Sequence, residues 1–253
     1  MKTDIETEQL RKYREVYTPE MFAHTKPQWD YFSKMCDIKI QLLKEYCSDK
    51  EVLDLCCGGG DFSLPAAQFA KKIIGIDFSP EMVSATVKKL ANCDNATAII
   101  ADATSLPFES ESFDSVFSYS SLYCIPDIEA AIKEVARVLR IQGIAVLDFG
   151  ILASLNTLVC RAYEDECAIP CHIKLDDMYR MLDKAGFKII QNRAFQILPY
   201  WGNKPKYLKP LLLSFWKSAM QKTVFGKMLD EWICKTPIIG RYAFRRIVVC
   251  QKQ

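Results

Sequence analysis

Short apolar runs alternate with helical patterns along the middle of the chain. The clearest helical pattern spans Ile128 to Leu139, where apolar residues recur every three or four positions and charged residues lie off that face. Gly143 follows this segment and is expected to form its left-handed cap. The apolar runs predict five strands: Val52–Leu55, Ile73–Ile76, Thr97–Ile100, Ser115–Ser118 and Ile144–Phe149. Strands that alternate with helices are typical of a parallel sheet with crossover helices.

The pattern continues beyond residue 150 with one helix and two more strands. A helix is predicted from Leu175 to Lys184, and Ala185-Gly186 ends it before the strand-like segment Phe187–Ile190. A last apolar run, Phe244–Cys250, predicts another strand. Residues 1–47 have a helical pattern and are rich in aromatic side chains.

The composition is that of a folded globular protein. The 253 residues are 50% hydrophobic and 25% charged, which suits one α/β domain and disfavours a disordered or fibrous protein. The sequence starts with polar and charged residues, and no apolar stretch approaches the roughly 18 residues that a membrane span needs. The 11 cysteines show no compact disulfide framework of the kind found in small secreted domains. We therefore expect a protein of the reducing cytoplasm.

Basic residues are concentrated near the end of the chain. The net charge is only +2, which disfavours a general nucleic-acid binder, but residues 199–253 hold eleven Lys or Arg against two acids. An aromatic-rich insertion at 200–242 lies in this region, and its segment Leu211–Lys222 has the pattern of a basic amphipathic helix. Such a helix can lie on an anionic membrane surface or cover a hydrophobic substrate. It can equally pack on the domain with its lysines in solvent.

A glycine-rich turn follows the first predicted strand, in the stretch Glu51–Pro65, EVLDLCCGGGDFSLP. The strand stops at Asp54, and Gly58–Gly60 then leave backbone N–H groups accessible to a ligand before a helix begins. A phosphate-binding P-loop needs Lys-Ser/Thr after the glycines, where this chain has Asp-Phe-Ser. A dinucleotide fold needs a third glycine where Ser63 stands, although Asp77 supplies its acid, so a nicotinamide-dependent oxidoreductase stays an alternative.

Two further carboxylates follow the next strands. Asp77 ends the second strand and is suited to accept hydrogen bonds from two ribose hydroxyls. Asp102, with Ala103 after it, closes the third strand, where the carboxylate can accept from an adenine amino group and the next backbone N–H can meet a ring nitrogen. With no pyrophosphate motif, these residues indicate an adenosine carried by a group other than phosphate.

Four segments in order carry a family resemblance: VLDLCCGGGDFS, GIDFSPEM, ADATSLPFESESFDSVFS and IPDIEAAIKEVARVLRIQG. The chain resembles a class I S-adenosylmethionine-dependent methyltransferase, nearest to the ubiquinone/menaquinone-biosynthesis type. The resemblance implies an α/β, Rossmann-like, seven-stranded, mostly parallel sheet and S-adenosyl-L-methionine as cofactor. It also implies an N-terminal helical lid (1–47), a cofactor-binding core (48–150) and a substrate-side region (151–253) that carries a helical insertion before the last strand, all in one domain.

The resemblance also implies the cofactor-binding residues. The methionine end, the ribose and the adenine are assigned, in chain order, to Asp54, Cys56, Gly58, Gly60, Asp77, Phe78, Asp102 and Ala103, with Ser118 as a further contact. Family members often have glycine at the position of Cys56, where a small side chain is expected to fit. Cys57 is expected to be a small packing residue; the alternative is a reactive thiol whose pKa is lowered by a helix N-terminus.

The residues of the chemistry are harder to identify, because methyl transfer from a sulfonium depends on positioning and a base is optional. His24 is a weak candidate, since the N-terminal segment of this family often folds over the cofactor. Tyr123 is another, because the region after the fourth strand usually faces the methyl group; packing is the alternative for both. Cys160, Cys167, Cys171 and His172 form C-x6-C-x3-C-H, which lacks the tight spacing of a zinc site, so no metal is expected.

The expected function is methyl transfer to a C, O or N centre of a small, apolar or lipid-linked acceptor. A polar small molecule or a macromolecule is the alternative acceptor. The alternative classes are the oxidoreductase and a non-catalytic S-adenosylmethionine-binding module. We expect no nucleic-acid partner and a cytoplasmic protein with peripheral membrane contact through 200–242.

Overall fold

The computed structural model describes residues 11, 30–163, 171–200, 202 and 204–253. Its centre is a seven-stranded sheet with the strand order β3-β2-β1-β4-β5-β9-β6. In chain order the strands of this sheet are β1 (Glu51–Leu55), β2 (Lys72–Asp77), β3 (Ala96–Ile100), β4 (Phe113–Ser118), β5 (Leu139–Gly150), β6 (Phe187–Phe195) and β9 (Arg245–Lys252). The predicted α/β fold with a mostly parallel sheet is confirmed.

The first five strands are parallel, and β9 runs antiparallel to both β5 and β6. The carboxyl ends of β1 to β5 therefore meet at one edge of the sheet, and β9 begins at that edge because it runs the other way. Ligands of open α/β sheets bind beyond this edge, so the functional site is expected there.

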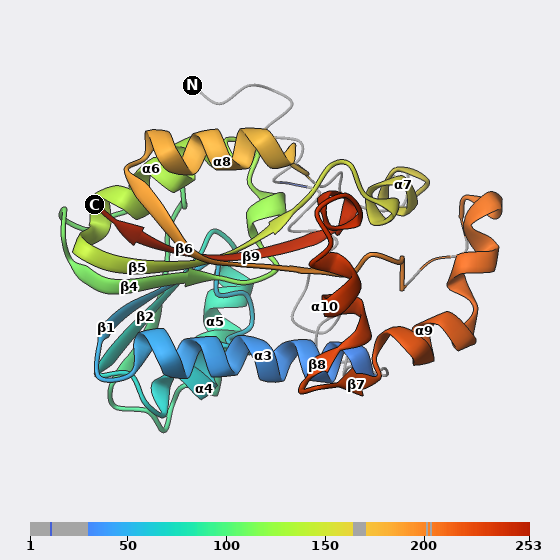
Figure 1. Cartoon of the computed structure of the whole chain (residues 1–253). Helices are drawn as coiled ribbons and strands as arrows, with labels where there is room; N and C mark the ends of the chain where they lie inside the picture. Colours follow the sequence, from blue (N-terminus) through green and yellow to red (C-terminus); the bar gives the residue numbers. More distant parts are fainter. Residues whose placement is uncertain (1–10, 12–29, 164–170, 201, 203) are drawn as a thin grey trace.

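Helices cover both faces of the sheet (Figure 1). One layer contains α3 (Asp30–Cys47) and α4 (Ser63–Ala67), and the other contains α6 (Ile128–Val138) and α8 (Leu175–Lys184). Successive residues of a strand face opposite layers: Val146 of β5 packs with the α3 layer, whereas Ala145 and Leu147 pack with the α6 layer. The remaining α-helices among the described residues are α5 (Pro80–Lys89), α7 (Leu155–Arg161), α9 (Ser214–Met220) and α10 (Leu229–Cys234). None of the described helices combines the length and the apolar character that crossing a bilayer requires.

The expectation that Gly143 caps α6 is wrong. The helix passes directly into β5 at Leu139, and Gly143 lies inside that strand. The left-handed residue is Gln142, with φ of 64°. Gly143 is required for another reason, because a Cβ there would lie 2.7 Å from the carbonyl oxygen of Arg140. Gly186, with φ of 79°, does follow the end of α8 as predicted.

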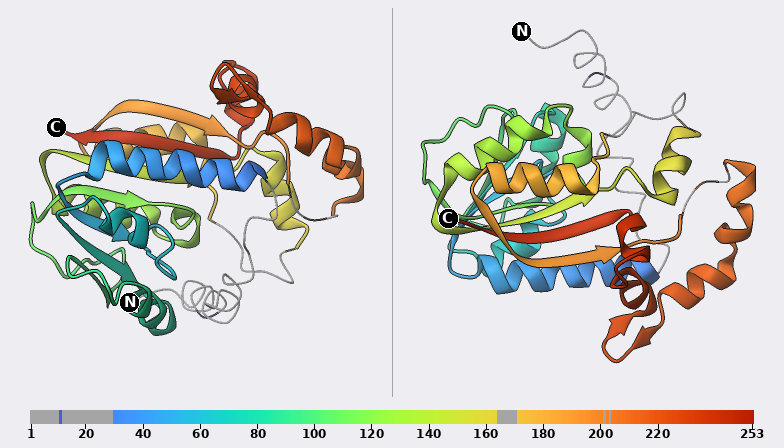
Figure 2. Two further views of the ribbon diagram at one scale, coloured as in Figure 1. Left: turned by 90° about the horizontal axis from the view of Figure 1, so that it is seen from below. Right: turned by 45° about the horizontal axis from the view of Figure 1, so that its top comes forward.

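The insertion at 200–242 is built from short pieces. The helix predicted over Leu211–Lys222 is only α9, and η2 (Lys206–Leu212), a 3-10 segment with Pro210 inside it, precedes α9. Leu213 between them is extended, which breaks the continuous helix that the polar pattern suggested. The pieces η2 and α9 extend beyond the sheet in two views (Figures 1 and 2). The two-residue strands β7 (Thr223–Val224) and β8 (Lys227–Met228), η1 (Leu122–Cys124) and η3 (Ile239–Tyr242) complete the described elements.

A buried acid of the insertion, Asp230, contacts both α3 and the end of β6. Its Oδ2 accepts hydrogen bonds from the Tyr31 hydroxyl at 2.6 Å and the Gln196 N–H at 2.6 Å, and its Oδ1 accepts from the Ile197 N–H at 3.0 Å. Asp230 is fully buried, so these bonds replace the water that a carboxylate needs. The described part of the N-terminal region, α3, is thereby tied to a segment almost 200 residues later in the chain.

Candidate functional site

The site starts at Asp54, near the carboxyl end of β1. The carboxylate is 3% exposed and accepts a hydrogen bond from the Ser63 hydroxyl, with 2.5 Å between Oδ2 and Oγ. Burial raises the pKa of Asp54 to about 7; the charge of Asp77 adds to this, and the Ser63 bond opposes it. Because Ser63 is the first residue of α4, this hydrogen bond joins β1 to α4 and so fixes the two ends of the glycine turn.

The turn after β1 follows a left-handed path. Cys56 has φ of 60°, Gly58 of 53° and Gly60 of 77°. A cysteine therefore stands here in the left-handed region, which glycine adopts most readily. A Cβ built on Gly58 or Gly59 meets no atom of the described residues within 4 Å, so this part of the chain leaves the backbone of the turn uncovered. The carbonyl of Gly58 accepts a hydrogen bond of 2.6 Å from Thr86, which holds the turn against α5.

Asp77 ends β2 beside this turn. Its Oδ2 accepts from the Gly58 N–H and its Oδ1 from the Ser79 N–H, both at 3.0 Å. The side chain is 7% exposed. Two backbone donors therefore fix the orientation of the carboxylate and join the ends of β1 and β2 into one unit. Phe78, the next residue, is half-buried.

The next two strands place the other predicted cofactor residues at the same edge. Beyond β3, Asp102 Oδ1 accepts from the Thr104 N–H at 2.9 Å and the Thr104 hydroxyl at 2.8 Å, and Ala103 is buried. Ser118 ends β4, and its buried hydroxyl has no hydrogen-bond partner within the described residues. Buried hydroxyls are normally paired, and Ser118 departs from this rule within the described residues.

These residues fit S-adenosylmethionine. The open glycine backbone can lie against the methionine part, the fixed carboxylate of Asp77 can accept from ribose hydroxyls, and Asp102 with Ala103 can meet the adenine. The strand order places β3, β2, β1 and β4 side by side, so the assigned groups form a row along the sheet edge. The orphaned hydroxyl of Ser118 lies at the end of that row.

Of the two catalytic candidates, only Tyr123 can be placed, because His24 lies outside the described residues. The Tyr123 ring packs near Phe244 at 6.3 Å and His172 at 6.0 Å between ring centroids. Burial raises the pKa of the Tyr123 hydroxyl to about 12, and Arg245 opposes the shift. At neutral pH Tyr123 is therefore a hydroxyl and not a phenolate.

His172 belongs to this group and was weighed from the sequence only as a metal ligand. Its Nδ1 lies 2.8 Å from the Thr157 hydroxyl, and its buried Nε2 has no hydrogen-bond partner in the described part of the chain. Burial lowers the pKa of His172 to about 4, and Arg161 and Arg245 lower it further, so the ring is neutral at pH 7. Cys167 of the C-x6-C-x3-C-H pattern lies outside the described residues, and the described ones include no group of three metal-ligating side chains.

Cys57 does not have the environment of a reactive thiol. It is 7% exposed and packs with Val83 and Ala98, and burial raises its pKa instead of lowering it. The alternative of a helix N-terminus that lowers its pKa is therefore wrong, and the structure supports a packing role. A Cβ on Gly75 would lie 2.9 Å from the Cys57 sulfur, so the thiol fills the space beside that glycine.

Sequence comparison finds a similar protein family for part of the chain. Residues 53–147 match the family described as "Methyltransferase domain". A demethylmenaquinone methyltransferase of Staphylococcus aureus is 38% identical over 99 residues, which are 38% of this chain and 41% of that relative. The similarity thus spans less than half of the relative and is confined to part of this chain.

Solved structures share the fold over a much larger part of the chain. An S-adenosylmethionine-dependent methyltransferase of Thermotoga maritima covers 97% of this chain and is itself covered completely, with a TM-score of 0.62 and 18% identity. One of Mesorhizobium loti covers 85% of this chain, with 96% of that protein matched, a TM-score of 0.60 and 16% identity. At these identities the likeness shows the fold alone. Residues 53–147 of the chain are thus similar to the methyltransferase domain, and the fold is shared with S-adenosylmethionine-dependent methyltransferases.

Proposed function

We propose that this protein transfers the methyl group of S-adenosylmethionine to a small acceptor molecule. The observation that carries the proposal is the open glycine turn at Gly58 joined to the fixed carboxylate of Asp77, in the segment that matches the methyltransferase domain. Asp102 and the Ser118 hydroxyl, which has no hydrogen-bond partner in the described part of the chain, continue this row along the sheet edge.

The residues of the chain act by positioning the cofactor and the acceptor. S-adenosylmethionine supplies an electrophilic methyl group on a sulfonium, whose leaving group is already good. Asp77 and the glycine turn hold the cofactor so that the methyl group faces the acceptor. This scheme does not require a dedicated base. His172 and Tyr123 are both uncharged at neutral pH, and their rings are suited to pack against an acceptor.

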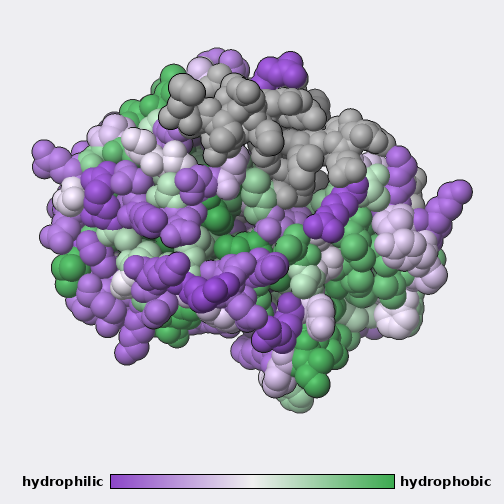
Figure 3. Space-filling view, turned by 90° about the horizontal axis from the view of Figure 1, so that it is seen from above, coloured by the Kyte–Doolittle hydropathy of each residue, from purple (hydrophilic) through white to green (hydrophobic). Residues whose placement is uncertain are grey.

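An apolar or lipid-linked acceptor is the class that we favour. The insertion exposes large apolar side chains that the domain does not cover: Tyr207 is 68% exposed, Phe215 69%, Phe225 92% and Ile238 78%. In Figure 3, hydrophobic side chains gather on the right half of the face shown, the side on which η2 and α9 extend. The relative of Staphylococcus aureus is named for its action on demethylmenaquinone, which favours an acceptor of the same kind here.

We also propose that the insertion contacts a membrane that holds this acceptor. Exposed apolar side chains beside lysines are the combination that binds anionic bilayers. Replacing Lys217 and Lys222 with Glu is expected to weaken binding to phosphatidylserine-containing liposomes. A matched control is the pair Lys72→Glu and Lys188→Glu, which changes the same charge on exposed strand residues. Equal loss in both double variants, or no loss in the first, would contradict the membrane contact.

The experiment that tests the function is methyl transfer from labelled S-adenosylmethionine into a cell extract separated into lipid, small-polar and macromolecular fractions. Label in the lipid fraction is expected. Label only in the other fractions would keep the enzyme class and reject the apolar acceptor. The absence of transfer, with S-adenosylhomocysteine still bound, would favour a non-catalytic binding module. Displacement of S-adenosylhomocysteine by a nicotinamide dinucleotide would favour the oxidoreductase.

A further inference from the structure

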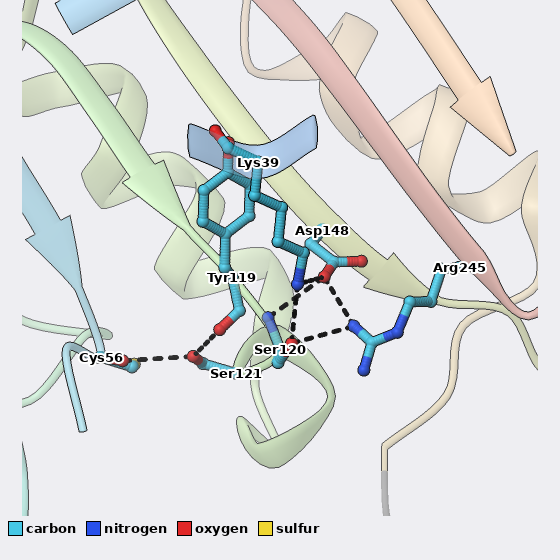
Figure 4. Close-up of polar contacts among 7 residues, drawn as sticks. All are labelled: Lys39, Cys56, Tyr119, Ser120, Ser121, Asp148 and Arg245. Carbon is cyan, nitrogen blue, oxygen red and sulfur yellow. Dashed lines mark hydrogen bonds and ion pairs between the residues drawn. The ribbon is translucent and has the colours of Figure 1, made fainter. Parts of the chain in front are cut away.

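A buried cluster of charged residues lies beside the proposed cofactor site (Figure 4). The Lys39 Nζ of α3 is 2.9 Å from Asp148 Oδ2 of β5, and the Arg245 Nη1 of β9 is 2.6 Å from the same oxygen. Both cations also donate to the Ser120 hydroxyl, at 2.9 and 3.0 Å. Lys39 is 4% exposed and Asp148 is fully buried. Three distant parts of the chain therefore supply one compact cluster, here called the Lys39–Asp148–Arg245 cluster.

The cluster has an excess of positive charge. Among the described residues it combines two cations with one carboxylate, and both cations use the same oxygen, Oδ2. Burial lowers the pKa of Lys39, and the attraction of Asp148 only partly offsets the burial and the repulsion of Arg245. An unbalanced buried charge is strongly unfavourable unless an opposite charge joins it.

The location relates the cluster to the acceptor. Ser120 follows β4, and its N–H donates to Asp148 Oδ2 at 3.2 Å from a left-handed conformation with φ of 61°. The adjacent Ser121 hydroxyl donates to the carbonyl oxygen of Cys56 at 3.1 Å, which connects the cluster to the glycine turn. On the other side, the Arg245 guanidinium lies 6.0 Å from the Tyr123 ring centroid. The cluster thus lies between the cofactor turn and the aromatic group of Tyr123.

We propose that Lys39 and Arg245 form a binding subsite for an anionic oxygen of the acceptor, a carboxylate or an ionised phenol or enol. This inference rests on the proposed methyltransferase function and narrows its substrate class to acceptors that carry an acidic oxygen. A single negative charge would balance the two cations and Asp148. The rest of the acceptor would then lie toward Tyr123 and the apolar side chains next to it.

A pair of small probes tests the charge preference on the unmodified protein. With S-adenosylhomocysteine at saturation, 4-fluorobenzoate and its neutral analogue 4-fluorobenzamide are titrated and followed by 19F NMR. The subsite predicts saturable binding of the benzoate and at least about tenfold weaker binding of the amide. Equal binding of the two probes, or binding of neither, would overturn the proposal.

Variants assign the effect to the cluster. Lys39→Met leaves a balanced Asp148–Arg245 pair and is expected to weaken benzoate binding at least about tenfold while the affinity for S-adenosylhomocysteine changes less than about twofold. Lys188→Met, at an exposed lysine of β6, is the control and should change neither. Asp148→Asn adds to the positive excess and should strengthen benzoate binding if the variant folds. Unchanged benzoate binding in Lys39→Met would overturn the assignment.

The two proposals fail in different ways. Failure of the unmodified protein to bind S-adenosylhomocysteine would refute the proposed function itself. Normal binding of S-adenosylhomocysteine without a preference for the benzoate would refute only the anion subsite. If Lys39→Met does not fold, the comparison of the two probes on the unmodified protein still decides the proposal.

Discussion

Replacing Asp77 with Asn tests the cofactor site most specifically among single substitutions. The carboxylate uses one oxygen for the Gly58 N–H and the other for the Ser79 N–H, each at 3.0 Å. An amide keeps only one acceptor oxygen, so its NH2 group must face one of these two donors. The substitution therefore loses one backbone bond as well as its negative charge toward the ribose.

The magnitude follows from the number and kind of these bonds. A hydrogen bond to a charged group contributes about 1.5–3 kcal/mol, and a buried donor left without a partner costs about 1–3 kcal/mol. We therefore expect Asp77→Asn to lower the free energy of unfolding by about 1–3 kcal/mol. The free energy of binding S-adenosylhomocysteine should become less favourable by about 1–3 kcal/mol, which corresponds to a loss of about 5- to 150-fold in affinity.

Calorimetric titration with S-adenosylhomocysteine measures the affinity, and urea unfolding measures the stability. Asp94→Asn is the control, because Asp94 is exposed and lies away from the proposed site, after α5. It should change neither quantity. If Asp77→Asn bound S-adenosylhomocysteine within about twofold of the unmodified protein, Asp77 would not contact the cofactor.

Three further predictions concern the turn, its supporting acid and the insertion. Gly58→Ala puts a methyl group where the ligand is expected to lie against the turn, so it should weaken S-adenosylhomocysteine binding at least about tenfold and lower the free energy of unfolding by about 1–2 kcal/mol. The control is Gly226→Ala, because Gly226 is also left-handed with φ of 75°; it should lower the free energy of unfolding without changing the affinity. Equal affinities of the two variants, measured by calorimetry, would contradict this prediction. Burial raises the pKa of Asp54 from 3.8 to about 7, so the stability that its neutral form provides is complete below about pH 4 and is lost as the pH rises to about 7. At pH 8, urea unfolding of Asp54→Asn should therefore give a free energy of unfolding higher than that of the unmodified protein by on the order of 2–4 kcal/mol. At pH 4 the two proteins should have the same free energy of unfolding. Equal stability of the two proteins at pH 8 would count against the raised pKa of Asp54. Asp230→Ala leaves the Tyr31 hydroxyl and the N–H groups of Gln196 and Ile197 without an acceptor, which costs about 1–3 kcal/mol of stability for each donor. Proteolysis within 200–242 should therefore be faster in the variant. An unchanged rate of cleavage would show that other contacts hold the insertion.

The strands and the parallel sheet could be predicted because the signal is local. Each strand of the sheet contains a short apolar run, and these seven runs are spaced by helical patterns or by the insertion. The acids that end β2 and follow β3 are equally visible, because a carboxylate directly after an apolar run stands at the sheet edge. The helix predicted over Leu211–Lys222 shows the limit of this approach, since polar spacing does not distinguish an α-helix from a 3-10 segment that changes direction at Leu213.

The Lys39–Asp148–Arg245 cluster could not be predicted in the same way. Its residues come from α3, β5 and β9, and only the antiparallel pairing of β9 with β5 brings Arg245 to the carboxyl end of β5. One signal was present in the sequence, because Asp148 is an acid inside the apolar run Ile144–Phe149. A buried acid needs a partner, but the sequence does not show which cations provide it.

The most direct test of the central claim is a crystal structure of the protein with S-adenosylhomocysteine. The account predicts the ribose hydroxyls within hydrogen-bond distance of Asp77, the adenine beside Asp102 and Ala103, and the amino-acid part against the turn at Gly58. A nucleoside bound away from the carboxyl ends of β1 to β4, or no bound nucleoside at saturating concentration, would contradict it.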